Sequence, residues 1–494
     1  MVKRSKSHVS ELHPADLDLH ARWQVEDYIH WPWRPRPCKV RILFYSDSGV
    51  TLTEPLPNPF TPGSTPAFDL GKVKQVLKAD PWYWVNFDVT FKLRSQPNSR
   101  LDQLNISANY DQIWFFGVGS GNVLTAAEIT ALNNFMNQGG GIFMTGDHAN
   151  LGQAIGQQIP RAGKIRQWPA PNAVQPFWNN TLREGPTPGF QFDDQSDDTP
   201  QPLRLKTYPA GFPWSYSWWK RYPHPLFCSQ WGPIKIFPDH QHEGEVILPG
   251  SFPAAEWPSK NGFQAKPELI AWGRILSPDA DVGRTVAVAA AYDGHRVDLG
   301  RIVTDSTWHH FFNINLWGYP QTAQGLNALK YIEAYYLNLA VWLAPPKLQS
   351  CMLNALCWGI LWHPKIWEIL ELKPIHLGLQ ARDVLGRYAP QCTIYRFIID
   401  RIPPDIRLKL EKIPDDGDFL PQVGPIEDLI LGEILSGMRG KHKGLDDTPK
   451  PPADLKSLDK VVTAAIERSF ESLLTTQERA LKQYRGILRG MLKG

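Results

Sequence analysis

The sequence has few cysteines, and they show no recognisable spacing. Its 494 residues include five, and no two form a Cys-x-x-Cys pair. The pattern therefore predicts neither a disulfide framework nor a zinc site built on thiolates. Scattered cysteines are typical of a reducing compartment, so we expect a cytoplasmic protein. The N-terminal residues have a basic start without the apolar core of a secretory signal.

The sequence also lacks an excess of charge of either sign. Its 52 basic and 49 acidic residues give a formal net charge of +3, which offers no whole-molecule reason to bind nucleic acid or a membrane. The most apolar stretch, residues 348–364, is too short and too polar for a membrane span, and we expect a buried helix there. The C-terminal end is basic and could contact an anionic partner, but a solvated helix face is the simpler explanation for its side chains, Lys482, Arg485, Arg489 and Lys493.

Tryptophan and proline are abundant, with 20 and 44 residues. Many of them lie between 168 and 260, where proline excludes regular helix, so we expect long loops held by aromatic side chains. The whole pattern predicts five parts: a Pro-rich N-terminal arm (1–38), an α/β domain (39–320) with a long Trp/Pro-rich insertion (about 160–260), a helical region (321–438), a linker (439–454) and C-terminal amphipathic helices (455–494).

The clearest local pattern is a strand, a helix and a second strand between residues 110 and 145. The strand at 110–116 ends in a glycine-rich loop, and Thr125 with Glu128 forms a capping box that starts a helix. This βαβ unit predicts an α/β fold of the flavodoxin-like type, with a mostly parallel sheet flanked by helices. Further strands are predicted at 39–45, 85–91, 285–291 and 301–304.

Polar residues follow several of these predicted strands. Asp47, the loop 117–121, Asp147 with His148, and Asp305 all come where a strand ends. Ligands of open parallel sheets bind at the carboxyl ends of the strands, so these residues are expected to share one edge.

Three histidine motifs carry the candidate chemistry, and the first two suit a metal. His148 takes the exposed position of a sharp strand-to-helix turn, where an imidazole serves as a general base or a metal ligand. His240 and His242 alternate along an extended segment beside Glu243, so both imidazoles point to one side, as a divalent metal requires. The structural alternatives are a helix-capping histidine and a chance tract on a surface loop.

The third motif is the adjacent pair His309 and His310, which follows Asp305. Because neighbouring side chains of an extended segment point opposite ways, we expect only His309 to face the site, with Asp305 orienting it or a ligand. The alternative is a buried, hydrogen-bonded histidine pair among aromatic residues.

We expect the three motifs to converge on one site. Neutral imidazoles and carboxylates suit Zn, Mn or Fe, and the candidate ligands of such a divalent metal are His148, His240, His242 and His309. A metal-activated water would need a nearby base. The candidate catalytic residues are Asp147, His148, Glu243, Asp305 and His309.

The stretch 39–316 resembles the class I glutamine amidotransferase-like superfamily, especially its ThuA-like branch. The strand and glycine loop at 110–121 correspond to the family's oxyanion loop, and residues 139–150 correspond to its nucleophile elbow. Residues 300–310 resemble the late strand that delivers the family's histidine. The resemblance implies cysteine at the elbow, where this sequence has His148, so glutaminase activity is not expected. ThuA-like proteins also lack that cysteine and are linked to sugar metabolism.

The sequence leaves three functions open. The first is a metal-dependent hydrolase acting on a small polar substrate such as a sugar derivative. The second is a metal-free enzyme in which Asp147, His148 and His309 perform acid–base catalysis. The third is a non-catalytic ligand-binding or scaffold protein. The expected ligand is a small molecule rather than nucleic acid or a membrane, and the C-terminal helices are candidates for self-association or for binding a protein partner.

Overall fold

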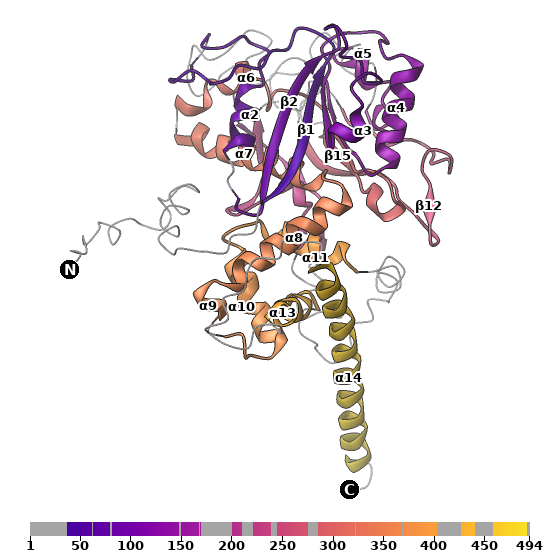
Figure 1. Ribbon diagram of the computed structural model, residues 1–494, viewed down its shortest axis with the longest axis vertical. Helices are drawn as coiled ribbons and strands as arrows, with labels where there is room; N and C mark the ends of the chain where they lie inside the picture. The colour runs from indigo at the N-terminus through magenta and orange to yellow at the C-terminus, as the bar shows by residue number, and fades with distance from the viewer. Residues whose placement is uncertain are drawn as a thin grey trace, which may run out of the picture.

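The computed structural model places the α/β domain above the helical region, with a long C-terminal helix extending away from both (Figure 1). The predicted arm at 1–38 and linker at 439–454 lie almost wholly outside the described residues. The described residues are 37–61, 63–79, 82–147, 150–166, 168, 200–209, 221–238, 245–274, 285–321, 323–367, 369–402, 426–439 and 458–491.

A central sheet of eight strands, counted among the described residues, organises the α/β domain in the order β2-β1-β3-β4-β16-β15-β14-β6. The first five of these strands are mutually parallel: β2 (Val85–Leu93), β1 (Cys38–Ser46), β3 (Gln112–Phe116), β4 (Gly141–Thr145) and β16 (Ile302–Asp305). The remaining strands pair antiparallel: β15 (Thr285–Tyr292), β14 (Glu268–Arg274) and β6 (Arg204–Leu205). The predicted α/β class with a mostly parallel sheet is confirmed, and β14 and β6 extend it beyond the predicted strands.

Helices cover both faces of the sheet because side chains alternate along its strands. On β1, Ile42 and Phe44 face one hydrophobic cluster, which includes α2 (Gly71–Lys78) and α7 (Ala323–Trp342). Leu43 and Tyr45 face the other cluster, which includes α4 (Ala126–Asn137). Figure 1 shows α2 and α7 on one side of the strands and α4 on the other, together with the short α3 (Ile106–Asn109) and α5 (Gln153–Gly156).

The predicted capping box at the start of α4 is confirmed. The Thr125 hydroxyl accepts a hydrogen bond from the Glu128 backbone, and the Glu128 carboxylate accepts one from the Thr125 backbone at 2.9 Å. Glu128 is fully buried, and Arg94 donates to both of its oxygens, at 3.1 and 2.9 Å. These hydrogen bonds and the Arg94 cation lower the pKa of Glu128 against the opposing effect of burial, which is the largest single influence.

The described part of the Trp/Pro-rich insertion contains short antiparallel ladders as well as the loops that the sequence predicts. Proline stands at the ends of several of these strands, where sheets more readily accommodate a residue without a backbone N–H. The paired strands are β5 (Pro200–Pro202) with β11 (Ile236–Pro238), β7 (Thr207–Pro209) with β8 (Arg221–Pro223), β9 (Cys228–Ser229) with β10 (Gly232–Pro233), and β12 (Ser259–Lys260) with β13 (Phe263–Gln264).

The described residues after 322 are mostly helical and share the first hydrophobic cluster with the sheet. The apolar stretch at 348–364 forms most of the buried helix α8, as predicted. No helix among the described residues is long and apolar enough to cross a membrane. Besides α7, the described α-helices that follow β16 in the chain are α6 (Asn313–Leu316), α8 (Pro346–Leu361), α9 (Pro364–Trp367), α10 (Pro374–Leu385), α11 (Gln391–Asp400), α13 (Ile426–Arg439) and α14 (Asp459–Met491).

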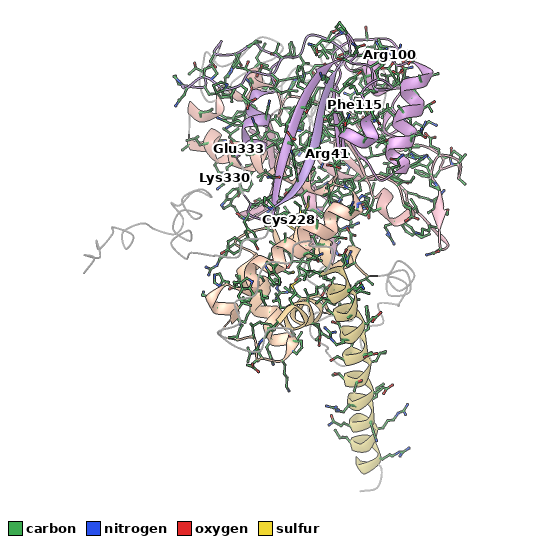
Figure 2. The ribbon with its side chains drawn as sticks, viewed as in Figure 1. Arg41, Arg100, Phe115, Cys228, Lys330 and Glu333 are labelled. Atoms are coloured by element: carbon green, nitrogen blue, oxygen red, sulfur yellow. A yellow bond between two sulfur atoms is a disulfide. The ribbon has the colours of Figure 1, made fainter. Side chains whose placement is uncertain are left out.

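Two disulfides join the helical region to the α/β domain. Cys38 at the start of β1 pairs with Cys351 in α8, and Cys228 in β9 pairs with Cys392 in α11. Figure 2 shows Cys228 where the two regions meet. The prediction of no disulfide framework is wrong, because pairs 313 and 164 residues apart leave no spacing signal. Disulfides persist in oxidising compartments, so the two bonds argue against the cytoplasmic setting that we expected.

A buried network of two arginines and two aspartates connects the same regions. Arg301, fully buried just before β16, contacts Asp293 at 2.8 Å and also pairs with Asp400 at the end of α11. Arg396 pairs with Asp293 and, at 2.8 Å, with Asp400. Each cation thus lies between two anions, an arrangement in which removing any one member leaves a buried charge uncompensated.

Candidate functional site

The carboxyl ends of β1, β3, β4 and β16 meet at one edge of the sheet, because these strands run parallel and adjacent. Asp47 follows β1, the loop 117–121 follows β3 and Asp147 follows β4, while Asp305 is the last residue of β16. The sequence prediction of a shared polar edge is therefore confirmed for these residues, all of which the structure describes.

The Asp47 carboxylate holds the glycine loop that follows β3 in place through backbone hydrogen bonds. Its carboxylate accepts hydrogen bonds from the backbone of Val118 at 2.9 Å, Gly119 at 2.6 Å and Ser48 at 3.0 Å. A side chain on Gly119 would place its Cβ 2.5 Å from the Asp47 carboxylate, so only glycine allows this approach. The resemblance to amidotransferases implied an oxyanion loop here. Two of its amides instead already donate to Asp47.

The backbone that follows β4 packs directly against the same loop. A Cβ on Gly117 would lie 2.8 Å from the Gly152 carbonyl oxygen, and a Cβ on Gly146 would lie 2.5 Å from the Trp168 ring. Gly152 itself has φ of +90°, a conformation that side-chain-bearing residues rarely adopt. Glycine at these three positions therefore allows the two loops to come into contact, and this contact sets the position of Asp147, which directly follows Gly146.

Asp147 and His309 lie side by side at the centre of this edge. The His309 Nε2 atom is 3.3 Å from Asp147 Oδ2, an ion-pair distance, although these two atoms do not meet hydrogen-bond geometry. Thr307 connects the two residues, since its hydroxyl donates to Asp147 Oδ1 at 3.1 Å and accepts from the His309 backbone at 3.2 Å. All three side chains are fully buried.

Asp305 contacts His310 rather than His309, so the first part of the expectation, that Asp305 orients His309, is wrong, and its role toward a ligand stays a prediction. His310 Nε2 lies 2.8 Å from Asp305 Oδ2, and the Tyr335 hydroxyl of α7 donates to the same oxygen at 2.9 Å. The His310 ring also stacks on Phe237, with centroids 4.3 Å apart.

The reason for the error is local, because residues 308–312 form turns rather than an extended segment. The Phe311 backbone donates to the Trp308 carbonyl at 2.8 Å. Alternation of side chains therefore does not apply, and both histidines are completely buried.

Arg166 completes the described cluster, and sequence reasoning missed it. Its Nη2 donates to the backbone carbonyls of Asp147 at 2.8 Å and Ser306 at 2.5 Å, and its guanidinium lies 4.2 Å from the Trp168 ring centroid. Burial lowers the pKa of Arg166 to about 10, while Asp147 and Asp305 act in the opposite direction, so the side chain is cationic at neutral pH. Its Nε and Nη1 atoms have no hydrogen-bond partner within the described part of the chain.

Several predicted site residues fall outside the described residues. These are His148, His240, His242 and Glu243. Within the ranges that the structure describes, no group of three or more His, Cys, Asp or Glu side chains could hold a metal ion. At the centre of this edge, the aspartate and histidine side chains form two pairs instead, Asp147 with His309 and Asp305 with His310. The proposed ligands His148, His240 and His242, and the identity of any metal, remain predictions.

Comparisons with known proteins give the following. No family model and no curated protein matches this sequence. One similar solved structure is a putative ThuA-like protein from Bacteroides uniformis, with a TM-score of 0.27, 12% identity, and coverage of 63% of this chain and 93% of that one. Another is a cytoplasmic protein from Salmonella typhimurium, with a TM-score of 0.23, 13% identity, and coverage of 62% and 100%. Scores this low carry no argument about family or activity, and the α/β class of this chain rests on its own sheet.

Proposed function

We propose that this chain is a hydrolase of small polar substrates that uses the Asp147–His309 pair for acid–base catalysis without a metal. The observation that carries the proposal is the 3.3 Å approach of a carboxylate to an imidazole at the carboxyl edge of a parallel sheet. A carboxylate beside an imidazole holds the ring in place and stabilises its protonated form. His309 then takes a proton from the attacking water and returns it to the leaving group.

Arg166 supplies the positive charge that this chemistry needs. Hydrolysis places negative charge on an oxygen of the substrate, and donors fixed in a dry site stabilise that charge strongly. The Arg166 guanidinium is anchored through Nη2 to the carbonyl of Asp147, the residue that holds His309. Its Nε and Nη1 atoms are available among the described residues to donate to such an oxygen.

The metal-dependent alternative depends on His240, His242 and Glu243, which lie outside the described residues. It differs from our proposal in one measurable respect, because a metal-activated water requires a bound ion. Metal analysis of the purified chain therefore separates the two. Stoichiometric Zn, Mn or Fe that is lost in a His240→Ala/His242→Ala double variant supports the metal enzyme.

A non-catalytic scaffold is the second candidate, and a specific observation favours it. Asp147, His309, Asp305 and His310 are all completely buried. Buried polar groups that are mutually paired also serve simply to fix a fold. In that case the edge of the sheet is a structural network, and the chain binds partners elsewhere.

A substrate panel distinguishes these functions. The purified full chain is assayed against nitrophenyl esters, phosphates and glycosides and against small lactones, with and without a chelator. Our proposal expects turnover of at least one class, and turnover that persists with the chelator. Turnover abolished by the chelator and restored by metal supports the metal enzyme. The absence of turnover on every class supports the scaffold.

A further inference from the structure

Helix α14 has two halves with different surroundings. Its first half packs on the body, where Val462, Ile466 and Leu473 are buried and Arg468 pairs with Glu433 of α13 at 2.8 Å. The second half, residues 474–491, extends away from the body to the C-terminus (Figure 1). In Figure 2 the side chains drawn on this half project away from the other described elements. This half is about 27 Å long at 1.5 Å per residue, and no other described element lies beside it in Figure 1.

The apolar face of the docked half continues along the projecting half. Leu474, Leu481 and Ile487 are 59%, 44% and 61% exposed. At about 100° per residue, these three side chains fall within an arc of roughly 140°. The same arc contains the buried Ile466 and Leu473. The buried apolar side chains of the first half therefore have counterparts in the second half that remain exposed among the described residues.

The opposite face of the projecting half is basic. Arg479, Lys482, Arg485 and Arg489 are all exposed and fall within an arc of about 120°. The only acidic residue among positions 474–491 is Glu478. The near-balance of charge over the whole chain, which predicted no membrane partner, conceals this local excess.

These two faces favour a lipid surface, rather than a second copy of the chain, as the binding partner of the projecting half. A coiled coil uses a narrow apolar seam with opposite charges on its flanks, whereas a second copy would present the same cations. A wide apolar face opposite Lys and Arg is the pattern of a helix that lies in the plane of a bilayer interface. Anionic headgroups attract such cations directly.

We propose that residues 474–491 of α14 lie flat on an anionic phospholipid bilayer. Leu474, Leu481 and Ile487 enter the acyl boundary, and the basic face contacts the headgroups. The helix anchors the chain to the surface without spanning it, in agreement with the absence of a spanning helix among the described residues.

Flotation of the full chain with vesicles tests this proposal. Vesicles of phosphatidylcholine alone are compared with vesicles that also contain phosphatidylglycerol, at low and at high salt. We expect binding only to the anionic vesicles, weakened by salt because exposed charges are screened. Arg485→Glu is expected to reduce binding roughly tenfold or more, and Leu481→Asp to abolish it.

The matched control is Lys460→Glu, the same charge reversal at an exposed position in the docked half of the same helix, and it leaves binding unchanged. Both substituted positions of the projecting half are exposed, and circular dichroism confirms that the variants fold. No binding to either vesicle, or equal binding by Arg485→Glu and wild type, overturns the proposal. A dimer in light scattering that Leu481→Asp converts to monomer also overturns it, in favour of a second copy.

Discussion

The two disulfides lead to a prediction about the number of reactive thiols that could not be made from the sequence alone. Under denaturing conditions without reductant, alkylation and mass spectrometry are expected to find one reactive thiol, that of Cys357, out of five cysteines. The other four cysteines are paired, as Cys38–Cys351 and Cys228–Cys392. Five alkylated cysteines in freshly purified protein would refute the pairing.

The stabilisation follows from the length of chain that each bond closes. In the chain-entropy model, a loop of 313 residues corresponds to about 5–6 kcal/mol and one of 164 residues to about 5 kcal/mol. Measured disulfides give less, typically about 2–4 kcal/mol. Cys351→Ser is therefore expected to lower the free energy of unfolding by about 2–5 kcal/mol in urea denaturation without reductant.

The matched control is Cys357→Ala, which removes a buried but unpaired cysteine. Its cost is expected to be about 1 kcal/mol, the usual size for a small change in a core. With reductant present, the difference between wild type and Cys351→Ser should disappear. Equal stability of Cys351→Ser and Cys357→Ala without reductant contradicts the account of the disulfides as covalent connections between the two regions.

The remaining predictions concern stability at two other positions. Asp47→Ala removes three hydrogen bonds to the Val118, Gly119 and Ser48 amides. It is expected to lower the free energy of unfolding by about 3 kcal/mol in urea denaturation, since bonds to a charged group contribute about 1.5–3 kcal/mol each and do not add fully. A loss below about 1 kcal/mol contradicts the role of Asp47 in holding the glycine loop. Burial, with Arg396 and Arg301 nearby, lowers the pKa of His224 well below its ordinary value of 6.5. Below pH 6.5 the unfolded chain therefore binds a proton at His224 that the folded chain does not. The free energy of unfolding then falls with acidification by up to about 1.4 kcal/mol per pH unit. His224→Asn, which retains an acceptor for the Leu226 amide, should show a shallower decline between about pH 7 and about pH 5; an unchanged slope contradicts this.

Local sequence signals predicted the core of the sheet well. The strand before the glycine loop, the Thr125–Glu128 capping box and the next strand are all set by neighbours within a few residues. Each buried strand also shows its own apolar run, which is how the edge carrying Asp47 and Asp147 could be placed from the sequence. The short strand β6 has two residues and no such signal.

The contacts at the site depended on geometry that no local pattern encodes. Whether Asp305 meets His309 or His310 is decided by the turns after Trp308 and by Tyr335, which arrives from α7. Arg166 reaches Asp147 from 19 residues away and Ser306 from 140. A buried arginine is rare unless something holds it, but the sequence gives no sign of burial at this position. The disulfide pairings were hidden for the same reason, since their partners are brought together only by the finished fold.

The central claim is that the Asp147–His309 pair performs the chemistry, and one measurement tests it most directly. On the substrate that the panel identifies, kcat/KM of His309→Gln is compared with that of His376→Gln, the same substitution at an exposed histidine of α10. We predict a loss of about 10²–10⁴-fold for His309→Gln, the usual contribution of a general acid–base group, and no change for His376→Gln. Equal kcat/KM for the two variants would contradict the account.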